Sequence, residues 1–322
     1  MANLGYIQVT RDCNQHCRFC SNPPIETKQT FDRVCAQIED LAERGYDGVI
    51  LTGGEPTLVP FLPDAIRFCS GMGIAARIIT NGQRLSNLDY LELLVAAGLD
   101  HVHVSLHSSR SEVQAWITKN PRSFENIAAA LSNLAVVGVT ADINTVICAQ
   151  NADHLEETVA WVLEHHPHIR HFVWNNLDPD TDRCRQNPEV IPRLADFEVS
   201  LHRAMALVAR SRRTFRVERV PLCYMADFAR CSTETRKIVK KEERVVHFLD
   251  EHKGTVLQTE WTHFKAQACR VCRLDSICAG LYGAPEFFDP NELYPLFIDP
   301  ALVRRQVLES SAESQPDWVP DA

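Results

Sequence analysis

The chain has 322 residues, of which 45% are hydrophobic, so it is long enough for one large domain with a smaller appended region. Its net charge of −9 argues against sequence-independent nucleic-acid binding, which needs clustered lysines and arginines. No apolar run approaches the roughly 18 residues of a membrane span, and the first residues lack a signal-peptide pattern. We therefore expect a cytoplasmic protein with no nucleic-acid or membrane partner, whose clustered cysteines bind metal rather than form disulfides.

An order of strand, helix, glycine and strand repeats over about the first 180 residues. Strands are expected at 6–9, 48–52, 74–80, 101–106, 141–147 and 171–174, with helices at 31–44, 60–71, 86–97, 123–136 and 153–166. This alternation predicts an α/β fold with parallel strands covered by helices, either a doubly wound sheet or a partial barrel. In both folds, the chemistry lies at the carboxyl ends of the strands.

The composition changes after about residue 180. A helix at 194–210 and a strand at 215–220 are followed by a region in which the alternation fails and five cysteines occur. We expect a core over 1–180, a connecting helix and strand over 181–220, a cluster-binding domain over 221–309 and a mobile tail over 310–322. The basic stretch 236–244 is interleaved with two glutamates and predicts a solvated helix face.

Three cysteines follow the first expected strand: Cys13, Cys17 and Cys20, with the spacing CX3CX2C. Three thiolates this close together can bind three irons of a [4Fe–4S] cubane and leave the fourth iron open. The alternative is a zinc knuckle, although a structural zinc site usually closes its coordination with four ligands. Phe19 is expected to shield the cluster from water.

This spacing, with an aromatic residue before the last cysteine, resembles the radical S-adenosylmethionine (SAM) superfamily. The resemblance covers residues 5–180 and implies an incomplete (β/α)6, TIM-like barrel. It also implies that the open iron chelates SAM and that one electron splits SAM into methionine and a 5′-deoxyadenosyl radical, which abstracts a substrate hydrogen. The electron would come from a donor such as flavodoxin or ferredoxin.

Residues after the later strands extend the resemblance. Gly53, Gly54, Glu55 and Pro56 resemble the GGEP motif that engages the SAM amino group, with two glycines that let backbone approach a ligand closely. The resemblance implies further SAM contacts at Thr80, Asn81, Ser105, His107, Asn144, Trp174 and Asn175. For His107, which strand periodicity places on the same face as Ser105, a structural hydrogen bond is an equal alternative.

A second cysteine group follows at Cys269, Cys272 and Cys278, with the spacing CX2CX5C. Together with Cys223, or with Cys231 as the competing fourth ligand, it can hold another [4Fe–4S] cluster; a zinc ribbon is the alternative. The spacing resembles part of a SPASM domain, but Tyr282 stands where that domain has a further cysteine. The resemblance therefore implies a twitch-like domain with a single auxiliary cluster.

The expected function is oxidation, epimerisation or cross-linking of a small metabolite or a ribosomally made peptide. Cys184 and Cys231 are candidate hydrogen-atom donors to a substrate radical, although exposed loop thiols are often idle. The histidines between residues 165 and 171 are expected in a solvated turn. The alternative function is a non-enzymatic iron–sulfur or zinc protein that senses redox state or transfers electrons, which explains the cysteines but not the GGEP sequence.

Overall fold

The computed structural model describes residues 3–250, 252–283 and 286–309, so the tail expected at 310–322 lies outside the described residues. The strands are β1 (Leu4–Thr10), β2 (Gly48–Gly53), β3 (Ala75–Thr80), β4 (Leu99–Ser105), β5 (Thr140–Ile147), β6 (His171–Asn176), β7 (Thr214–Glu218), β8 (Arg244–His247) and β9 (Thr255–Gln258). The helices are α1 (Phe31–Glu43), α2 (Leu62–Gly71), α3 (Leu88–Ala96), α4 (Ser111–Thr118), α5 (Ser123–Val137), α6 (Leu155–His165), α7 (Asp182–Gln186), α8 (Leu194–Arg210), α9 (Thr233–Lys240) and α10 (Pro300–Glu309).

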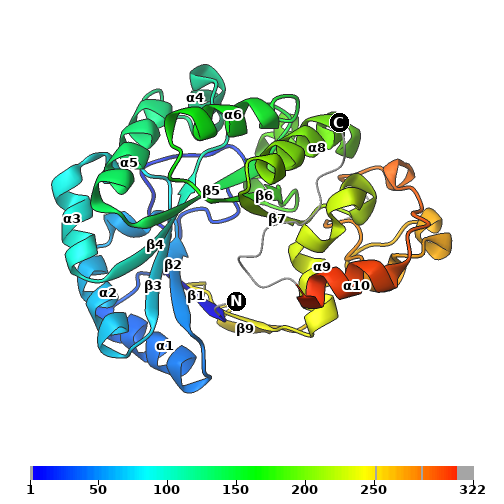
Figure 1. Ribbon diagram of the computed structural model, residues 1–322. Helices are drawn as coiled ribbons and strands as arrows, with labels where there is room; N and C mark the ends of the chain where they lie inside the picture. Colours follow the sequence, from blue (N-terminus) through cyan, green and yellow to red (C-terminus); the bar gives the residue numbers. More distant parts are fainter. Residues whose placement is uncertain (1–2, 251, 284–285, 310–322) are drawn as a thin grey trace.

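All nine strands belong to one sheet, in the order β7-β6-β5-β4-β3-β2-β1-β8-β9. Neighbouring strands from β7 to β8 are parallel, and only β9 runs antiparallel, as a hairpin partner of β8. The sheet curls into an open barrel with the helices α1 to α6 and α8 outside it (Figure 1). The expected partial barrel is therefore confirmed, and its six predicted strands are all present.

The strand expected at 215–220 is present as β7, and it pairs with β6 rather than merely connecting two domains. The glycine after α1 closes that helix as expected, because Gly45 adopts a left-handed conformation with φ of 77°. The short helices α4 and α7, the helix α10 and the β8–β9 hairpin had no counterpart among the predicted elements, whereas α9 overlaps the helix face expected at 236–244. They are short or carry many charges, which weakens the apolar periodicity used to find helices and strands.

The two faces of the strands differ sharply in character. Side chains on the outer face, such as Ile78, Val104 and Phe172, are buried against the helices as the main hydrophobic core. The inner face carries polar and charged side chains, among them Arg77, His103 and Asp142. A strand buried on both faces usually carries apolar residues on both, so this polar inner face marks a lined cavity rather than a packed core.

The last third of the chain returns to the first strand. β8 pairs with β1, aligning Tyr6 with Val246 and Ile7 with His247. Beyond it, the amide of Leu249 donates to Gln8 Oε1 at 3.3 Å, and the same oxygen accepts from Arg11 Nε at 3.0 Å. The C-terminal region is therefore anchored at the base of the loop that carries Cys13, Cys17 and Cys20.

Candidate active site

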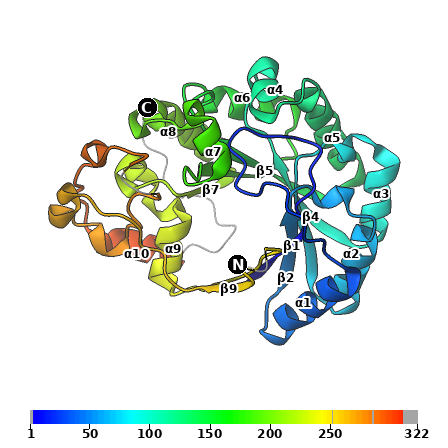
Figure 2. The same ribbon diagram turned by 180° about the vertical axis from the view of Figure 1, so that it is seen from behind.

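The loop after β1 lies across the carboxyl end of the sheet, close to α7 (Figure 2). The Arg18 side chain fixes this loop by donating to Trp116 O at 3.1 Å and to Asn187 Oδ1 at 3.1 Å. Phe19 is 8% exposed and packs with Ile117 and Leu177 in a second, small hydrophobic cluster. The aromatic residue therefore anchors the loop to the barrel and covers it with apolar surface.

The thiols of Cys13, Cys17 and Cys20 are neighbours. Burial, and then repulsion from Cys20 and Cys13, raise the pKa of Cys17, and burial raises the pKa of Cys13. Thiolates in such a place need positive charge or hydrogen-bond donors. The backbone amides of Gln15 and Asn22 point at Cys13 Sγ and Cys20 Sγ, both at 3.4 Å.

Three thiols on one loop can hold three irons of a [4Fe–4S] cubane. The amide donors to Cys13 and Cys20 suit such a cluster, because its properties depend on N–H···S bonds. In the parts of the chain that the structure describes, the compact group that could hold a single metal ion is a different one: His101, His103 and Asp142, whose ligand atoms lie within 4.8 Å of one another.

Gly53 and Gly54 bring β2 into close contact with this loop. Gly53 has φ of 137°, and a Cβ there would overlap the carbonyl oxygen of Thr10. A Cβ on Gly54 would overlap the carbonyl oxygen of Asp12. The amides of Gly54 and Glu55 donate to Thr10 O at 2.7 Å and to Asp12 O at 2.8 Å. The close backbone approach expected at the two glycines is thus made to the cysteine loop.

Glu55 is fully buried and joins the ends of two strands. Its Oε1 accepts from the Thr57 amide at 3.1 Å, the Thr57 hydroxyl at 2.6 Å and the Thr80 hydroxyl at 2.7 Å. Its Oε2 accepts from the Asn81 amide at 2.7 Å. Burial raises the pKa of Glu55, and these four donors oppose that rise. Pro56 begins the short turn Pro56–Leu58 that stiffens the exit from β2.

This network extends to the first cysteine loop. The amide nitrogen Nδ2 of Asn81 lies 3.6 Å from Cys13 Sγ and donates to Asn14 Oδ1 at 2.7 Å. Glu55 and Thr80 are 0% and 2% exposed, so both brace the site from behind rather than facing open space. Of the residues that follow β2 and β3, Asn81 is the one placed directly beside a cluster thiol.

Asn144 and Asn175 lie side by side on the inner face of β5 and β6, with Asn175 Nδ2 donating to Asn144 Oδ1 at 2.7 Å. Ser105 is in register with Asn144 on the same face.

Trp174 differs from its expected placement. Strand alternation turns it to the outer face, where it is 2% exposed and packs against Phe172 and Phe215.

His107 lies just beyond β4 and has structural partners. Its Nδ1 accepts from the Val146 amide at 3.2 Å, and its ring meets the edge of Phe19 at a centroid distance of 5.0 Å. Burial lowers the pKa of His107 to about 4, so the ring is neutral near pH 7 and can accept at Nδ1. The sequence left open whether His107 contacts SAM or makes a structural hydrogen bond, and the structure contains the hydrogen bond.

The second cysteine group also assembles. Burial raises the pKa of Cys223 to about 12, and repulsion from Cys278 and Cys269 contributes, which marks these three thiols as neighbours. The Gly280 amide donates to Cys278 Sγ at 3.3 Å and the Leu296 amide to Cys272 Sγ at 3.4 Å. These four thiols with amide donors suit a fully ligated cluster, as the first three suit an open one.

The two other candidate cysteines lie elsewhere. The charges that act on Cys231 are those of Arg230, Arg216 and Arg236, and its own side chain is 8% exposed. Cys184 is fully buried in α7, and its thiol donates to Asp178 O at 3.3 Å. Cys184 therefore packs under the first cysteine loop, whereas the sequence suggested a polar loop.

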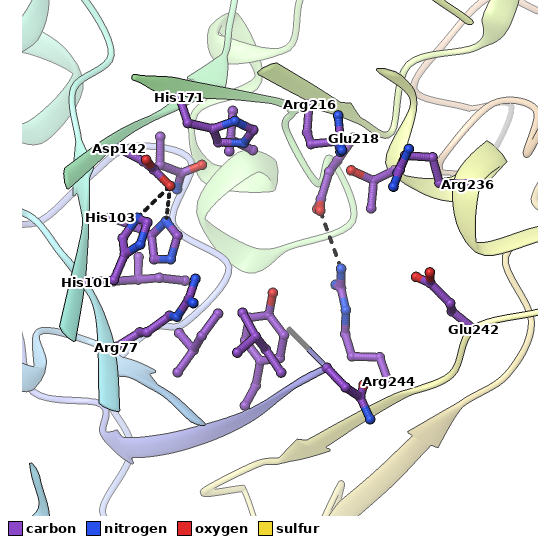
Figure 3. A pocket seen from close by; sticks show the side chains of 18 of the residues that line it. Arg77, His101, His103, Asp142, His171, Arg216, Glu218, Arg236, Glu242 and Arg244 are labelled. Carbon is purple, nitrogen blue, oxygen red and sulfur yellow. Dashed lines mark hydrogen bonds and ion pairs between the residues drawn. The ribbon is translucent and has the colours of Figure 1, made fainter. Parts of the chain in front are cut away.

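A cavity of about 1460 Å³ fills the barrel, lined from the amino ends of the strands up to Asn144 and Asn175 (Figure 3). Its lining includes Arg77, His101, His103, Asp142, His171 and Arg216, which the sequence analysis did not select. The sequence does contain a pattern that could have indicated them, because charged or imidazole side chains occupy every second position of strands that were expected to be buried. The basic stretch near 236–244 also lines this cavity, and Arg236 is 2% exposed, so it is not a solvated helix face.

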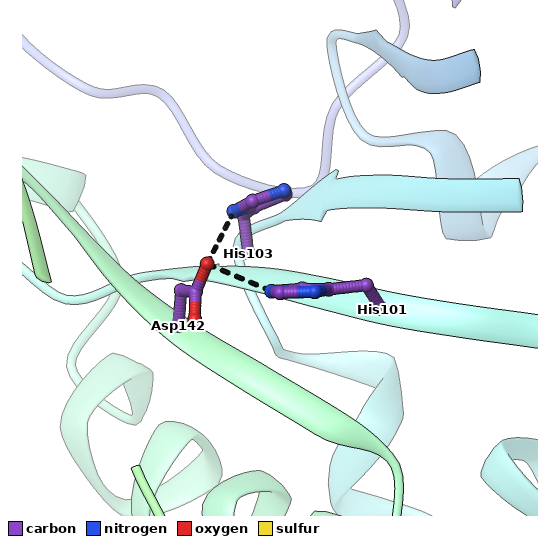
Figure 4. A group of neighbouring side chains, drawn as sticks. All are labelled: His101, His103 and Asp142. Atoms are coloured by element: carbon purple, nitrogen blue, oxygen red, sulfur yellow. Dashed lines mark ion pairs between the residues drawn. The ribbon is translucent and has the colours of Figure 1, made fainter. Parts of the chain in front are cut away.

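Two histidines and one carboxylate form the most compact polar group in this cavity (Figure 4). Asp142 Oδ2 lies 2.7 Å from His101 Nε2 and 3.3 Å from His103 Nδ1, and the two imidazoles stack with centroids 4.6 Å apart. Although Asp142 is buried, its bonds to His101 and His103 hold its pKa well below the usual range. Burial lowers the pKa of His103 and brings that of His171 to about 4.

Comparison with known proteins identifies the core domain. Residues 7–162 match the family model described as the Radical SAM superfamily, so the chain contains a radical SAM domain. GTP 3′,8-cyclase of Chlorobaculum tepidum is 32% identical over 206 residues, which cover 59% of this chain and 60% of the relative. PqqA peptide cyclase of Ruegeria pomeroyi is 27% identical over 231 residues, which cover 69% and 59%. The chain thus spans about three fifths of the length of these curated relatives.

Solved structures share the fold. Streptococcus suis SuiB bound to S-adenosylmethionine superimposes with a TM-score of 0.66 at 17% identity, covering 92% of this chain and 77% of that one. The anSMEcpe structure with bound AdoMet gives a TM-score of 0.63 at 13% identity, covering 95% and 96%. Among the described residues, no helix of this chain is both long and apolar enough to cross a membrane.

Proposed function

We propose that the chain is a radical SAM enzyme with a single auxiliary [4Fe–4S] cluster, held in a C-terminal domain over 221–309. The observation that carries this proposal is the joint arrangement of Cys13, Cys17 and Cys20 with the Gly53–Pro56 segment that packs against their loop. A redox sensor would need the thiols, but it would have no use for a large polar cavity inside the barrel. Cys223, Cys269, Cys272 and Cys278 are the proposed auxiliary ligands.

When bound, the first cluster would supply one electron to SAM and so yield the 5′-deoxyadenosyl radical that abstracts a substrate hydrogen. The residues of this chain hold and shield that chemistry. Asn81 and the amides of Gln15 and Asn22 donate to the thiolates, while Phe19 covers the loop with apolar surface. The facing amides of Asn144 and Asn175 offer both donors and acceptors to the polar parts of SAM.

The substrate belongs in the barrel cavity, because this cavity is large enough for SAM and a second molecule. Ligand pockets usually measure about 300–1000 Å³, and this cavity measures about 1460 Å³. Relatives are named for action on a peptide, PqqA, and on a nucleotide, GTP. Oxidation, epimerisation or cross-linking of a small metabolite or peptide all begin with the same hydrogen abstraction. Electrons would come from a flavodoxin or ferredoxin.

The test is anaerobic reconstitution with iron and sulfide, reduction with dithionite and addition of SAM. We expect formation of 5′-deoxyadenosine and methionine, and a change in the EPR signal of the reduced cluster when SAM binds. Cys17→Ala is expected to abolish both, whereas Cys35→Ala, on the partly exposed side of α1, leaves them unchanged. A fully iron-loaded wild-type protein that forms no 5′-deoxyadenosine would favour the redox-sensor alternative.

A further inference from the structure

The charge of the barrel cavity is opposite in sign to that of the whole chain. Ten lysine and arginine side chains line it against four aspartate and glutamate side chains, a net of +6 with the histidines neutral. The complete chain carries −9. Cavities lined by one sign of charge concentrate ligands of the opposite sign, because the surrounding protein screens the field less than water does.

Part of this positive charge is balanced inside the cavity. Arg244 lies 3.4 Å from Glu218, and Lys237 lies 3.8 Å from Glu242. These residues come from one wall of the cavity, formed by β7, α9, the α9–β8 connection and β8, where Figure 3 shows Glu218, Glu242 and Arg244. The excess positive charge of the cavity therefore lies on arginines outside these two pairs.

Arg77 and Arg216 carry much of that excess. The nearest carboxylate to Arg77 is Asp100, 3.6 Å from Nε, and it does not line the cavity. Within the described residues, Arg77 Nε is buried with no hydrogen-bond partner. Arg216 donates from Nη1 to the Phe215 carbonyl at 2.9 Å, and burial lowers the pKa of Arg216. Both side chains are half-buried and Arg77 has a single ion pair at 3.6 Å, so a further oxyanion would stabilise both cations where they are held away from water.

The register of the sheet gives the scale of the ligand. Arg77 is aligned with His101, whereas Ser105 is aligned with Asn144, four residues further along β4. At about 3.3 Å per residue these two rows are roughly 13 Å apart. Arg216, aligned with Val173 and so with Asn144, lies in the upper row on another strand. Cationic groups therefore extend from the Arg77 row up to the row of Asn144, where the proposed SAM contacts begin.

A divalent cation is the competing occupant, because His101, His103 and Asp142 form a ligand set of two imidazoles and one carboxylate. The net charge of +6 around that set opposes a cation. Arg77 also lies close enough to His103 to contribute to the lowering of its pKa. The carboxylate already contacts two imidazoles, at 2.7 Å and 3.3 Å.

We infer that the barrel cavity binds an elongated small molecule bearing phosphate or carboxylate groups, with Arg77 and Arg216 as substrate-binding residues. This inference rests on the proposed function, since it specifies the substrate class of the same cavity. The anionic groups extend from the Arg77 row upwards, and the carbon that loses hydrogen lies near Asn144 and Asn175. Guanidinium groups suit both kinds of oxyanion, because they donate two parallel hydrogen bonds.

The experiment is calorimetric titration of the cluster-loaded wild-type protein with pyrophosphate and, separately, with tricarballylate. Neither titration needs SAM cleavage, so a failure here is distinct from failure of the proposed function. We expect at least one anion to bind, with pyrophosphate favouring a phosphate substrate and tricarballylate a carboxylate substrate. Arg77→Gln and Arg216→Gln should each weaken binding about tenfold, in line with the loss of a charge-assisted hydrogen bond.

The matched control is Arg122→Gln, an exposed arginine at the start of α5 that does not line the cavity. It is expected to bind the anion as the wild type does. Circular dichroism of each variant reports whether it is folded. Absence of binding to both anions, equal weakening in Arg122→Gln, or no change in the two cavity variants would overturn the inference. So would stoichiometric Zn²⁺ binding that Asp142→Asn abolishes in a protein that binds neither anion.

Discussion

Replacing Glu55 by glutamine tests whether this residue braces the first cysteine loop. Four donors converge on its two carboxylate oxygens, and two of them are backbone amides on different oxygens, those of Thr57 and Asn81. Glutamine has one oxygen, so in either orientation its NH2 group faces one of these amides. One buried N–H then loses its acceptor.

The expected cost follows from that contact. A hydrogen bond to a charged group contributes about 1.5–3 kcal/mol, so we expect a loss of about 2 kcal/mol. For a chain of this size that lowers Tm by about 4 °C. If the whole loss destabilises the loop that binds the cluster, the same energy corresponds to a roughly 30-fold lower affinity for iron.

Two assays check this expectation on the reconstituted protein: thermal unfolding followed by circular dichroism, and the rate of iron release to a chelator. Thr80→Ser should have a smaller effect, because serine keeps the hydroxyl that donates to Glu55 at 2.7 Å and accepts from the Gly82 amide at 3.0 Å. Glu43→Gln, on the exposed end of α1, is the matched control. The reasoning is refuted if Glu55→Gln unfolds and releases iron as Glu43→Gln does.

Three further outcomes are expected. Cys223→Ser should reduce the iron content by about four per chain, whereas Cys231→Ser should retain it; the reverse result would exchange the ligand assignment. Gly54→Ala should lose the first cluster because its methyl group overlaps the cysteine loop, while Gly71→Ala, with open space around it, should not; equal iron content in both would contradict the packing argument. Because the folded pKa of His107 is about 4, the unfolded chain takes up an extra proton as pH falls from about 6.5 to 4, and stability drops by about 3 kcal/mol in that window. His107→Asn keeps an acceptor for the Val146 amide and should flatten that pH dependence of urea unfolding, and an unchanged slope would rule out this residue as its source.

The sequence was informative where a residue type has few alternative uses. Cys13, Cys17 and Cys20, with Gly53 and Gly54 after the next strand, have the spacing that predicted a radical SAM domain. Strand and helix periodicity predicted parallel strands covered by helices, because outward apolar positions such as Ile78 recur with a regular period. The choice of a partial barrel over a doubly wound sheet came from the family resemblance. These signals are local, so a linear pattern contains them.

The remainder depends on contacts between distant segments. Cys223 and Cys231 are equivalent by spacing, and only the fold places one beside Cys269 and the other beside Arg216. Glu55 was expected to face a ligand, yet its partner Thr80 is 25 residues away on another strand. Trp174 was chosen for its position at a strand end, but strand alternation decides which way a side chain points.

The pairing of β1 with β8 has a consequence for the order of assembly. One edge of β1 receives its partner only when synthesis reaches residues 244–247, about 240 residues later. At 5–20 residues per second that delay is on the order of 12–50 s. During this interval Cys13, Cys17 and Cys20 emerge from the ribosome before the strand beneath them is fully paired. We therefore expect iron insertion to follow release of the chain, and nascent chains halted before residue 244 to expose thiols that the finished protein protects.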